Sequence, residues 1–318
     1  MKRRELIAML ALAAGARWHP AGAQQGEGPL VGMLRLAPGD PTDTFRRDMK
    51  AHGLEEGRNL QLLVVSAEGG GDRLAAAARE LVAGKADLII VFGDPSIRAA
   101  QQATTTIPIV GMTDDMLGSR LVTSLARPGG NTTGVSILAS ELDVKRLELL
   151  HEAVPQASPI GVIADFSTVS TRALLEAAAR RLGVGLVIQT IGRADEAGNA
   201  ADELTKAEVK AVNVLASPVI HTARAAIIER LNRARLPAIY QWPETAEEGG
   251  LLGYGPRFVE CYHQVAALAQ KILKGAKPAD LPIEQPTKFE LAVNLKTAKA
   301  IGLTLPQSFL ARADQVIE

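Results

Sequence analysis

The segment ADLIIVFGDPS, residues 86–96, joins a run of apolar residues directly to Gly-Asp-Pro-Ser. A short apolar run rich in branched residues predicts a strand that is buried on both faces, as in a parallel sheet. A helix normally follows such a strand, and Pro95 suits the first turn of that helix. Because parallel-sheet proteins bind ligands beyond the carboxyl ends of their strands, the loop around Gly93 is a candidate binding site.

The same alternation of apolar runs and helical patterns extends over most of the chain. Runs in the first half predict strands at residues 30–36, 60–66, 86–92 and 107–112. Further runs predict strands at residues 159–165, 185–191, 210–217 and 237–242. The segments between them have helical spacing, so we expect an α/β protein with two doubly wound parallel-sheet lobes. Similar strand starts, Ile-Pro at Pro108 and Leu-Pro at Pro237, indicate that the lobes repeat one plan.

Glycine and proline positions indicate where the chain passes between the two lobes. Gly-rich or Pro-rich breaks place hinge crossings near Gly134, Gly253 and Ala279. The first lobe is therefore expected to comprise residues 24–135 and 253–279, and the second to comprise residues 136–252 and 280–318.

The N-terminal segment has the pattern of an export signal. A basic start, MKRREL, precedes the apolar run IAMLALAAGA, and AGA at residues 21–23 fits a cleavage site before Gln24. Arg3 and Arg4 are compatible with both the general and the twin-arginine export routes. No cysteine follows the predicted cleavage site and no later run is long enough to span a bilayer. We therefore expect a signal peptide at residues 1–23 and a periplasmic protein without lipid anchor or membrane insertion.

Composition excludes several classes of function. Lys plus Arg and Asp plus Glu both number 35, so no basic excess favours nucleic acid, and the N-terminus holds the export signal instead of a repressor's DNA-binding helices. Cys261 is the single cysteine, which excludes disulfides and cysteine-based zinc sites, and we read it as a small apolar residue. Scattered histidines and the absence of hydrolase, zincin or phosphate-loop motifs argue against an enzyme. We expect no cofactor and no metal; an exported α/β enzyme acting on a small molecule is the alternative.

Several longer motifs resemble one known family. The segments LARPGGNTTGVSIL, KRLELLHEAVPQA, GGLLGYG and above all ILKGAKPADLPIEQPTKFELAVNLKTAKAIGLTLP resemble ABC-transporter substrate-binding proteins, whose best-known members bind tryptophan and related aromatic amino acids. The resemblance runs nearly end to end. It implies a type I periplasmic-binding fold whose lobes close on a small-molecule ligand, with an ABC permease and its ATPase subunits as partners. We expect a monomer.

Loops at strand ends of the first lobe supply candidate ligand contacts. Gly93 allows close backbone approach, Pro95 begins the helix, and Ser96 or free amides can donate to a ligand carboxylate. Many relatives carry Thr-Pro-Ala after this glycine, so Asp94 and Ser96 are departures; Asp94 pairs with a ligand ammonium or caps the helix. Further candidates are Thr113, Asp114 and Ser136. The alternative for Thr113 and Asp114 is that they form and cap a turn, and the alternative for Ser136 is that its hydroxyl satisfies backbone groups of the hinge. Many relatives have Asp-Pro where this chain has Asp115-Met116.

The second lobe supplies candidates of the same kind. Asp165 and Phe166 follow one strand and Ser217 follows another; Phe166 covers an apolar ligand face or caps the core. Trp242 ends a strand near a crossing, where its ring stacks on a ligand or is buried in the lobe. Tyr254 lies at the second crossing, with a hydroxyl that bonds the ligand or the hinge.

Overall fold

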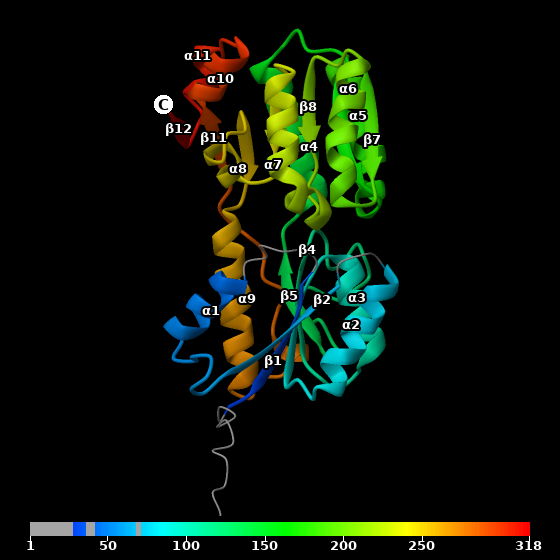
Figure 1. The fold of residues 1–318 in the computed structure, drawn as a ribbon, viewed down its shortest axis with the longest axis vertical. Coiled ribbons are helices and arrows are strands. Elements are labelled where there is room, and N and C mark those ends of the chain that lie inside the picture. The colour runs from blue at the N-terminus through cyan, green and yellow to red at the C-terminus, as the bar shows by residue number, and fades with distance from the viewer. Residues whose placement is uncertain (1–27, 36–41, 68–70) are drawn as a thin grey trace, which may run out of the picture.

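The computed structural model describes residues 28–35, 42–67 and 71–318. These residues form two α/β lobes, one above the other in Figure 1, with several chain segments passing between them. The predicted signal peptide lies outside the described residues. Within them, no helix is long and apolar enough to cross a membrane.

The first lobe is built on a parallel five-stranded sheet of order β2-β1-β3-β4-β5. Its strands are β1 (Leu30–Arg35), β2 (Gln61–Ser66), β3 (Leu88–Phe92), β4 (Ile109–Thr113) and β5 (Thr132–Ser136). Its helices are α1 (Thr42–Ala51), α2 (Gly71–Ala83), α3 (Asp94–Ala103) and α9 (Phe258–Leu273). Separate apolar clusters join α1 and α9 to one face of the sheet and α2 and α3 to the other. This double cover explains why β3, β4 and β5 are buried along their whole length.

The second lobe is built on a seven-stranded sheet of order β12-β11-β10-β9-β8-β6-β7. Its strands are β6 (Ile160–Asp165), β7 (Leu186–Ile191), β8 (Ala211–Val214), β9 (Ala238–Tyr240), β10 (Leu252–Gly255), β11 (Glu290–Asn294) and β12 (Gln315–Ile317). Its α-helices are α4 (Ala139–Ala153), α5 (Val169–Leu182), α6 (Ala197–Lys206), α7 (Pro218–Arg233), α8 (Pro243–Glu247), α10 (Leu295–Ile301) and α11 (Gln307–Leu310).

Strand order confirms the predicted repeat of two doubly wound units. From β7 to β10 the second sheet runs β7-β6-β8-β9-β10, which is the first lobe's order shifted by five strands. β11 then adds antiparallel to β10, and β12 adds parallel to β11. The chain leaves the first sheet after β5 and the second after β10, so equivalent strands lead into the crossings.

The crossings do not fall where glycine was expected to mark them. Gly134 lies within β5 and Gly253 within β10. A Cβ on Gly134 would lie 1.8 Å from the Gly111 carbonyl oxygen, and one on Gly253 would lie 2.3 Å from the Trp242 carbonyl oxygen. These glycines therefore permit close backbone packing, and the crossings lie elsewhere. Ala279 belongs to the 3-10 turn η3 (Pro278–Asp280), which contacts β5 of the first lobe.

Hydrogen bonds place the actual crossings a few residues later. The Ile137 amide still bonds the Thr113 carbonyl, so the first crossing follows it at Leu138, whose φ of 57° is left-handed. The second crossing follows Gly255, and α9 after it packs on the first lobe. Glu284 forms a bridge with Val135, so the third crossing lies between Glu284 and β11.

Candidate functional site between the lobes

The carboxyl ends of strands from both sheets meet between the lobes. β3 and β4 of the first lobe end next to α3 and the 114–118 turn, and β6, β8 and β9 of the second end next to α5, α7 and α8. The lobes are in direct contact there, because a Cβ on Gly93 would lie 3.0 Å from Cγ of Pro218, the first residue of α7. The structure thus brings together loops that the sequence analysis selected in separate lobes.

The β3–α3 turn is fixed by glycine geometry. Gly93 has φ 80° and ψ 151°, a conformation that is essentially restricted to glycine, and it is the N-cap residue of α3. Asp94 is therefore the first helical residue, and the alternative that its side chain caps the helix is wrong: no side chain caps α3. The Asp94 carboxylate instead accepts a hydrogen bond from the Thr113 hydroxyl. Pro95 is exposed in the first turn.

Gly93→Ala is expected to weaken ligand binding as well as stability. The Cβ strains the backbone, at about 1–3 kcal/mol, and meets Pro218 when the lobes are in contact. Gly275→Ala is the control, because Gly275 also has positive φ, 99°, but a Cβ at this position would have no other atom within 4 Å. Calorimetric titration and thermal melting should show both variants destabilised and only Gly93→Ala losing affinity; equal affinities would contradict the close approach.

Asp114 follows β4 and has the most unusual electrostatics of the site. It is half-buried, and its carboxylate accepts no hydrogen bond from the residues that the structure describes. Burial raises the pKa of Asp114 well above its ordinary value, and the charges of Asp143, Asp94 and Asp165 raise it further, while Arg146 opposes them. We call Asp94, Asp114, Asp143 and Asp165 the acidic cluster; it draws on both lobes.

The two serines of the first lobe behave differently. The Ser136 hydroxyl accepts a hydrogen bond from the Met116 amide at 3.2 Å and donates to the Asp114 carbonyl at 3.4 Å. It thus satisfies backbone groups, as its alternative interpretation proposed, and holds the turn that carries Asp114. Ser96 is fully buried, and its hydroxyl has no partner in the described part of the chain.

Asp165 and Ser217 form a linked pair in the second lobe. The Ser217 hydroxyl donates to Asp165 Oδ2 at 2.5 Å and accepts from the Ile220 amide at 3.2 Å, which makes Ser217 the N-cap of α7. The Thr168 amide donates to Asp165 Oδ1 at 3.2 Å. Both residues are buried, so this pair fixes the two strand-end loops relative to each other.

Asp143 and Arg146 on α4 were missed by the sequence analysis. They form an ion pair whose side chains are both 1 % exposed. Burial raises the pKa of Asp143, although Arg146 opposes this shift. Asp143 also accepts from the Ala216 amide at 3.3 Å, and Arg146 donates to the Tyr254 carbonyl at 2.8 Å. The available signal was their position in the buried stripe of a helix, where apolar residues are the rule.

Of two further second-lobe predictions, the one for Tyr254 stays a prediction and one alternative for Phe166 is wrong. Tyr254 is joined to the site through its backbone carbonyl, and its ring packs against the core of the second lobe. Burial raises the pKa of the Tyr254 phenol, and the charges of Arg146, Asp314 and Arg312 act on it as well, so contact of its hydroxyl with ligand stays a prediction. Phe166 does not cap the core, because it is 72 % exposed at the end of β6, with its ring close to Gly192.

Trp242 is buried, 4 % exposed, in an aromatic cluster that joins the lobes. Its ring meets that of Phe258 edge-on at 4.8 Å, and Phe258 continues the cluster to Tyr262 at 4.8 Å. His221 lies 4.5 Å from Phe258, and burial, with a smaller contribution from Arg224, lowers the pKa of His221 to about 3. Direct contact of Trp242 with ligand stays a prediction.

Comparisons with known proteins agree with the two-lobed fold. A curated tyrosine-binding protein of Clostridioides difficile is 27% identical over 264 residues, which are 81% of this chain and 75% of that protein. The crystal structure of a conserved domain protein from Vibrio cholerae has a TM-score of 0.83 and 27% identity, covering 91% of this chain and 100% of that one. An ABC domain in complex with L-Trp from a streptococcus has a TM-score of 0.80 and 23% identity, covering 92% and 100% of the two chains.

Two doubly wound lobes joined by three crossings, with strand-end loops gathered between them, define a two-lobed binding protein of the type I periplasmic-binding fold. Residues 41–317 match the family described as ABC transporter substrate binding protein, and the chain belongs to that family. It is a solute receptor; of the relatives described above, one is named a tyrosine-binding protein and another was crystallised with L-Trp. Cys261 is buried in the first-lobe core, as expected for a small apolar residue, and burial raises the pKa of its thiol to about 12.

Proposed function

We propose that this receptor captures an L-amino acid between its lobes in the periplasm and delivers it to an ABC permease driven by cytoplasmic ATPase subunits. The observation that carries the proposal is the Asp114 carboxylate, which has no hydrogen-bond partner among the described residues and is surrounded by three further carboxylates. A group in this position favours a cationic partner. The ammonium group of an amino acid supplies one.

The other groups of the site divide into satisfied and available ones. Asp94, Asp143 and Asp165 each accept a hydrogen bond from Thr113, Arg146 or Ser217. Asp114 is thus the member of the acidic cluster that is available for the ligand ammonium. The first turn of α3, with the buried Ser96 hydroxyl, offers donors for the ligand carboxylate at a helix N-terminus.

The relatives support an aromatic side chain on the ligand. One is named a tyrosine-binding protein, and another was crystallised with L-Trp. Capture by closure follows the usual thermodynamics: a ligand that contacts both lobes binds the closed arrangement better and shifts the population toward it. We further propose that the receptor binds its ligand without converting it and that it acts as a monomer.

Calorimetric titration with matched ligands tests the proposal. We expect L-tryptophan or L-tyrosine to bind, tryptamine to bind more weakly because it lacks the carboxylate, and indole-3-propionate to bind weakest because it lacks the ammonium. Equal binding of indole-3-propionate and L-tryptophan would contradict the role of Asp114. After incubation with the protein, the ligand is recovered and analysed by chromatography. We expect it to be unchanged, and a new product would favour the exported-enzyme alternative.

A further inference from the structure

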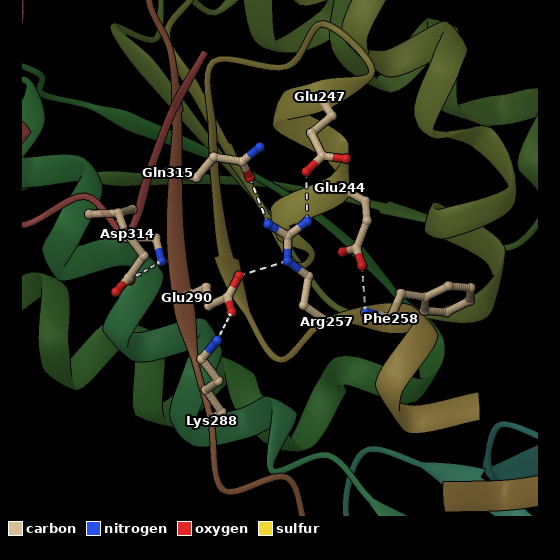
Figure 2. A network of polar contacts seen from close by, with 9 residues as sticks. Glu244, Glu247, Arg257, Phe258, Lys288, Glu290, Asp314 and Gln315 are labelled. Carbon is tan, nitrogen blue, oxygen red and sulfur yellow. Dashed lines mark hydrogen bonds and ion pairs between the residues drawn. The ribbon is translucent and has the colours of Figure 1, made fainter. Parts of the chain in front are cut away.

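Arg257 precedes α9, the helix that the second crossing delivers to the first lobe, yet its side chain binds the second lobe (Figure 2). Its Nε donates to Glu290 Oε2 at 2.6 Å, its Nη1 to Glu247 Oε1 at 2.6 Å, and its Nη2 to Gln315 Oε1 at 2.7 Å. The three acceptors belong to β11, α8 and β12. One guanidinium therefore joins the second crossing to strands β11 and β12 and to helix α8 of the second lobe.

Neighbouring contacts extend this network to the third crossing. Lys288, which lies in that crossing, pairs with Glu290 Oε1 at 2.5 Å. The Phe258 amide, the first of α9, donates to Glu244 Oε1 at 2.9 Å (Figure 2). Glu290 is thus shared between Arg257 and Lys288, and the second-lobe ends of two crossings are held together.

The chain between these anchors and the first lobe is short. α9 packs against α1 and against β3, β4 and β5, so its body belongs to the first lobe. Between Gly255, the last residue of β10, and Arg257 stands only Pro256, whose ring fixes its φ angle. Little chain is therefore available to absorb a movement of the lobes, and such a movement acts directly on the start of α9 and on the Arg257 contacts.

The environment of the Arg257–Glu290 pair makes it stronger than an ordinary surface ion pair. The side chains of Arg257 and Glu290 are 24% and 11% exposed, and charge-assisted bonds in such sites exceed those of exposed pairs. We propose that Arg257 is a positioning residue that holds the second and third crossings at one spacing, and thereby favours the arrangement in which the lobes meet. Without it, more lobe orientations become accessible and the population of the closed arrangement falls.

Distance measurement between spin labels tests the proposal without any ligand. The exposed residues Gln102 on α3 and Ala173 on α5 are changed to cysteine. Helices α3 and α5 lie on the side of each lobe away from α9 (Figure 1). Cys261 is buried, and burial raises its pKa to about 12, so it is protected from labelling. In Arg257→Gln we expect longer, broader distances and a fall of about fivefold or more in the closed-to-open ratio.

Arg224→Gln is the matched control. Arg224 binds Glu248 with two hydrogen bonds, of 2.6 and 2.9 Å, within the second lobe, and neither residue lies in a crossing. Both variants should melt at a lower temperature, but only Arg257→Gln should change the distances. Identical distance distributions in the two variants would overturn the proposal.

A graded series keeps the test decisive if Arg257→Gln does not fold. Arg257→Lys retains the charge but cannot reach all three acceptors, so its distances should lie between those of the wild type and Arg257→Gln. Glu247→Gln removes one charged acceptor and leaves Glu290 and Gln315 in place, and a small shift in the same direction is expected. Shortened distances in either variant would contradict the proposal. Because no ligand is present, these outcomes are independent of the proposed amino acid.

Discussion

Asp114→Asn is expected to weaken binding of L-tryptophan or L-tyrosine by about 2–5 kcal/mol, because the ligand ammonium would be left desolvated without its charged partner. Asp94→Asn is the control, since Asp94 already accepts a hydrogen bond from Thr113 and should lose little affinity. Calorimetric titration of both variants gives the comparison. A larger loss in Asp94→Asn than in Asp114→Asn would assign the ammonium to the other carboxylate.

The same substitution should stabilise the protein without ligand. The folded-state pKa of Asp114 lies well above its ordinary value, so between these two values the folded protein binds more protons than the unfolded chain. Stability from this group therefore falls as pH rises through that window and is lowest above the folded pKa. Asp114→Asn removes the penalty, and we expect a higher melting temperature than wild type at neutral pH and no difference in acid.

Ligand affinity should have the opposite pH dependence. An ammonium favours the ionised form of Asp114, so binding below the raised pKa releases a proton, and affinity increases with pH up to that value. Titrations in buffers of different ionisation enthalpy measure the released proton. Its absence in the wild type would remove Asp114 as the ammonium partner.

Trp242→Ala is expected to cost about 3–5 kcal/mol of stability, the usual cost of deleting a buried aromatic ring. Its ring is buried between His221 and Phe258, and its Nε1 has no partner among the described residues. Trp242→Phe should cost less, because it retains a ring and removes the unpaired N–H. Denaturant unfolding followed by circular dichroism measures both variants.

Ligand affinity tests the alternative, in which the Trp242 ring contacts the ligand. An unchanged unfolding free energy with a large loss of affinity in Trp242→Ala would mean that the ring contacts ligand rather than core. Trp242 is also the sole tryptophan in the described part of the chain. Its fluorescence in the wild type should therefore change when the lobes close, because Phe258 and His221 come from the elements that meet there.

Local pattern was sufficient for the elements and for several site loops. The run at residues 86–92 contains β3 (Leu88–Phe92), and the residues after it, Gly93 to Ser96, form the turn and first helical turn, with Gly93 next to Pro218 of the second lobe. Such elements are predictable because burial on both faces of a strand and proline near a helix start are properties of neighbouring residues. Asp114, Asp165 and Ser217 were selected for the same reason, as polar residues at or just after strand ends, and their contact with ligand stays a prediction.

Features that depend on distant residues could not be read in this way. Asp143 and Arg146 lie in the apolar stripe of α4, but their spacing of three residues is also that of an ordinary surface ion pair on a helix. Their burial follows from packing of α4 against β8, β9 and β10. Likewise, the sequence gives no indication that Arg257 meets Glu290 and Gln315, because residues 33 and 58 positions apart are joined only by strand pairing.

The sequence by itself determined the two α/β lobes, their repeated plan and the class of receptor, because each rests on local periodicity and on long motifs. Only the tertiary structure decided where the crossings lie. Gly134 and Gly253 resemble hinges in the sequence but lie within strands, where a neighbouring carbonyl leaves no room for a Cβ. The protonation of the site also depends on the tertiary structure. The pKa of Asp114 depends on its burial and on carboxylates that folding brings together from both lobes.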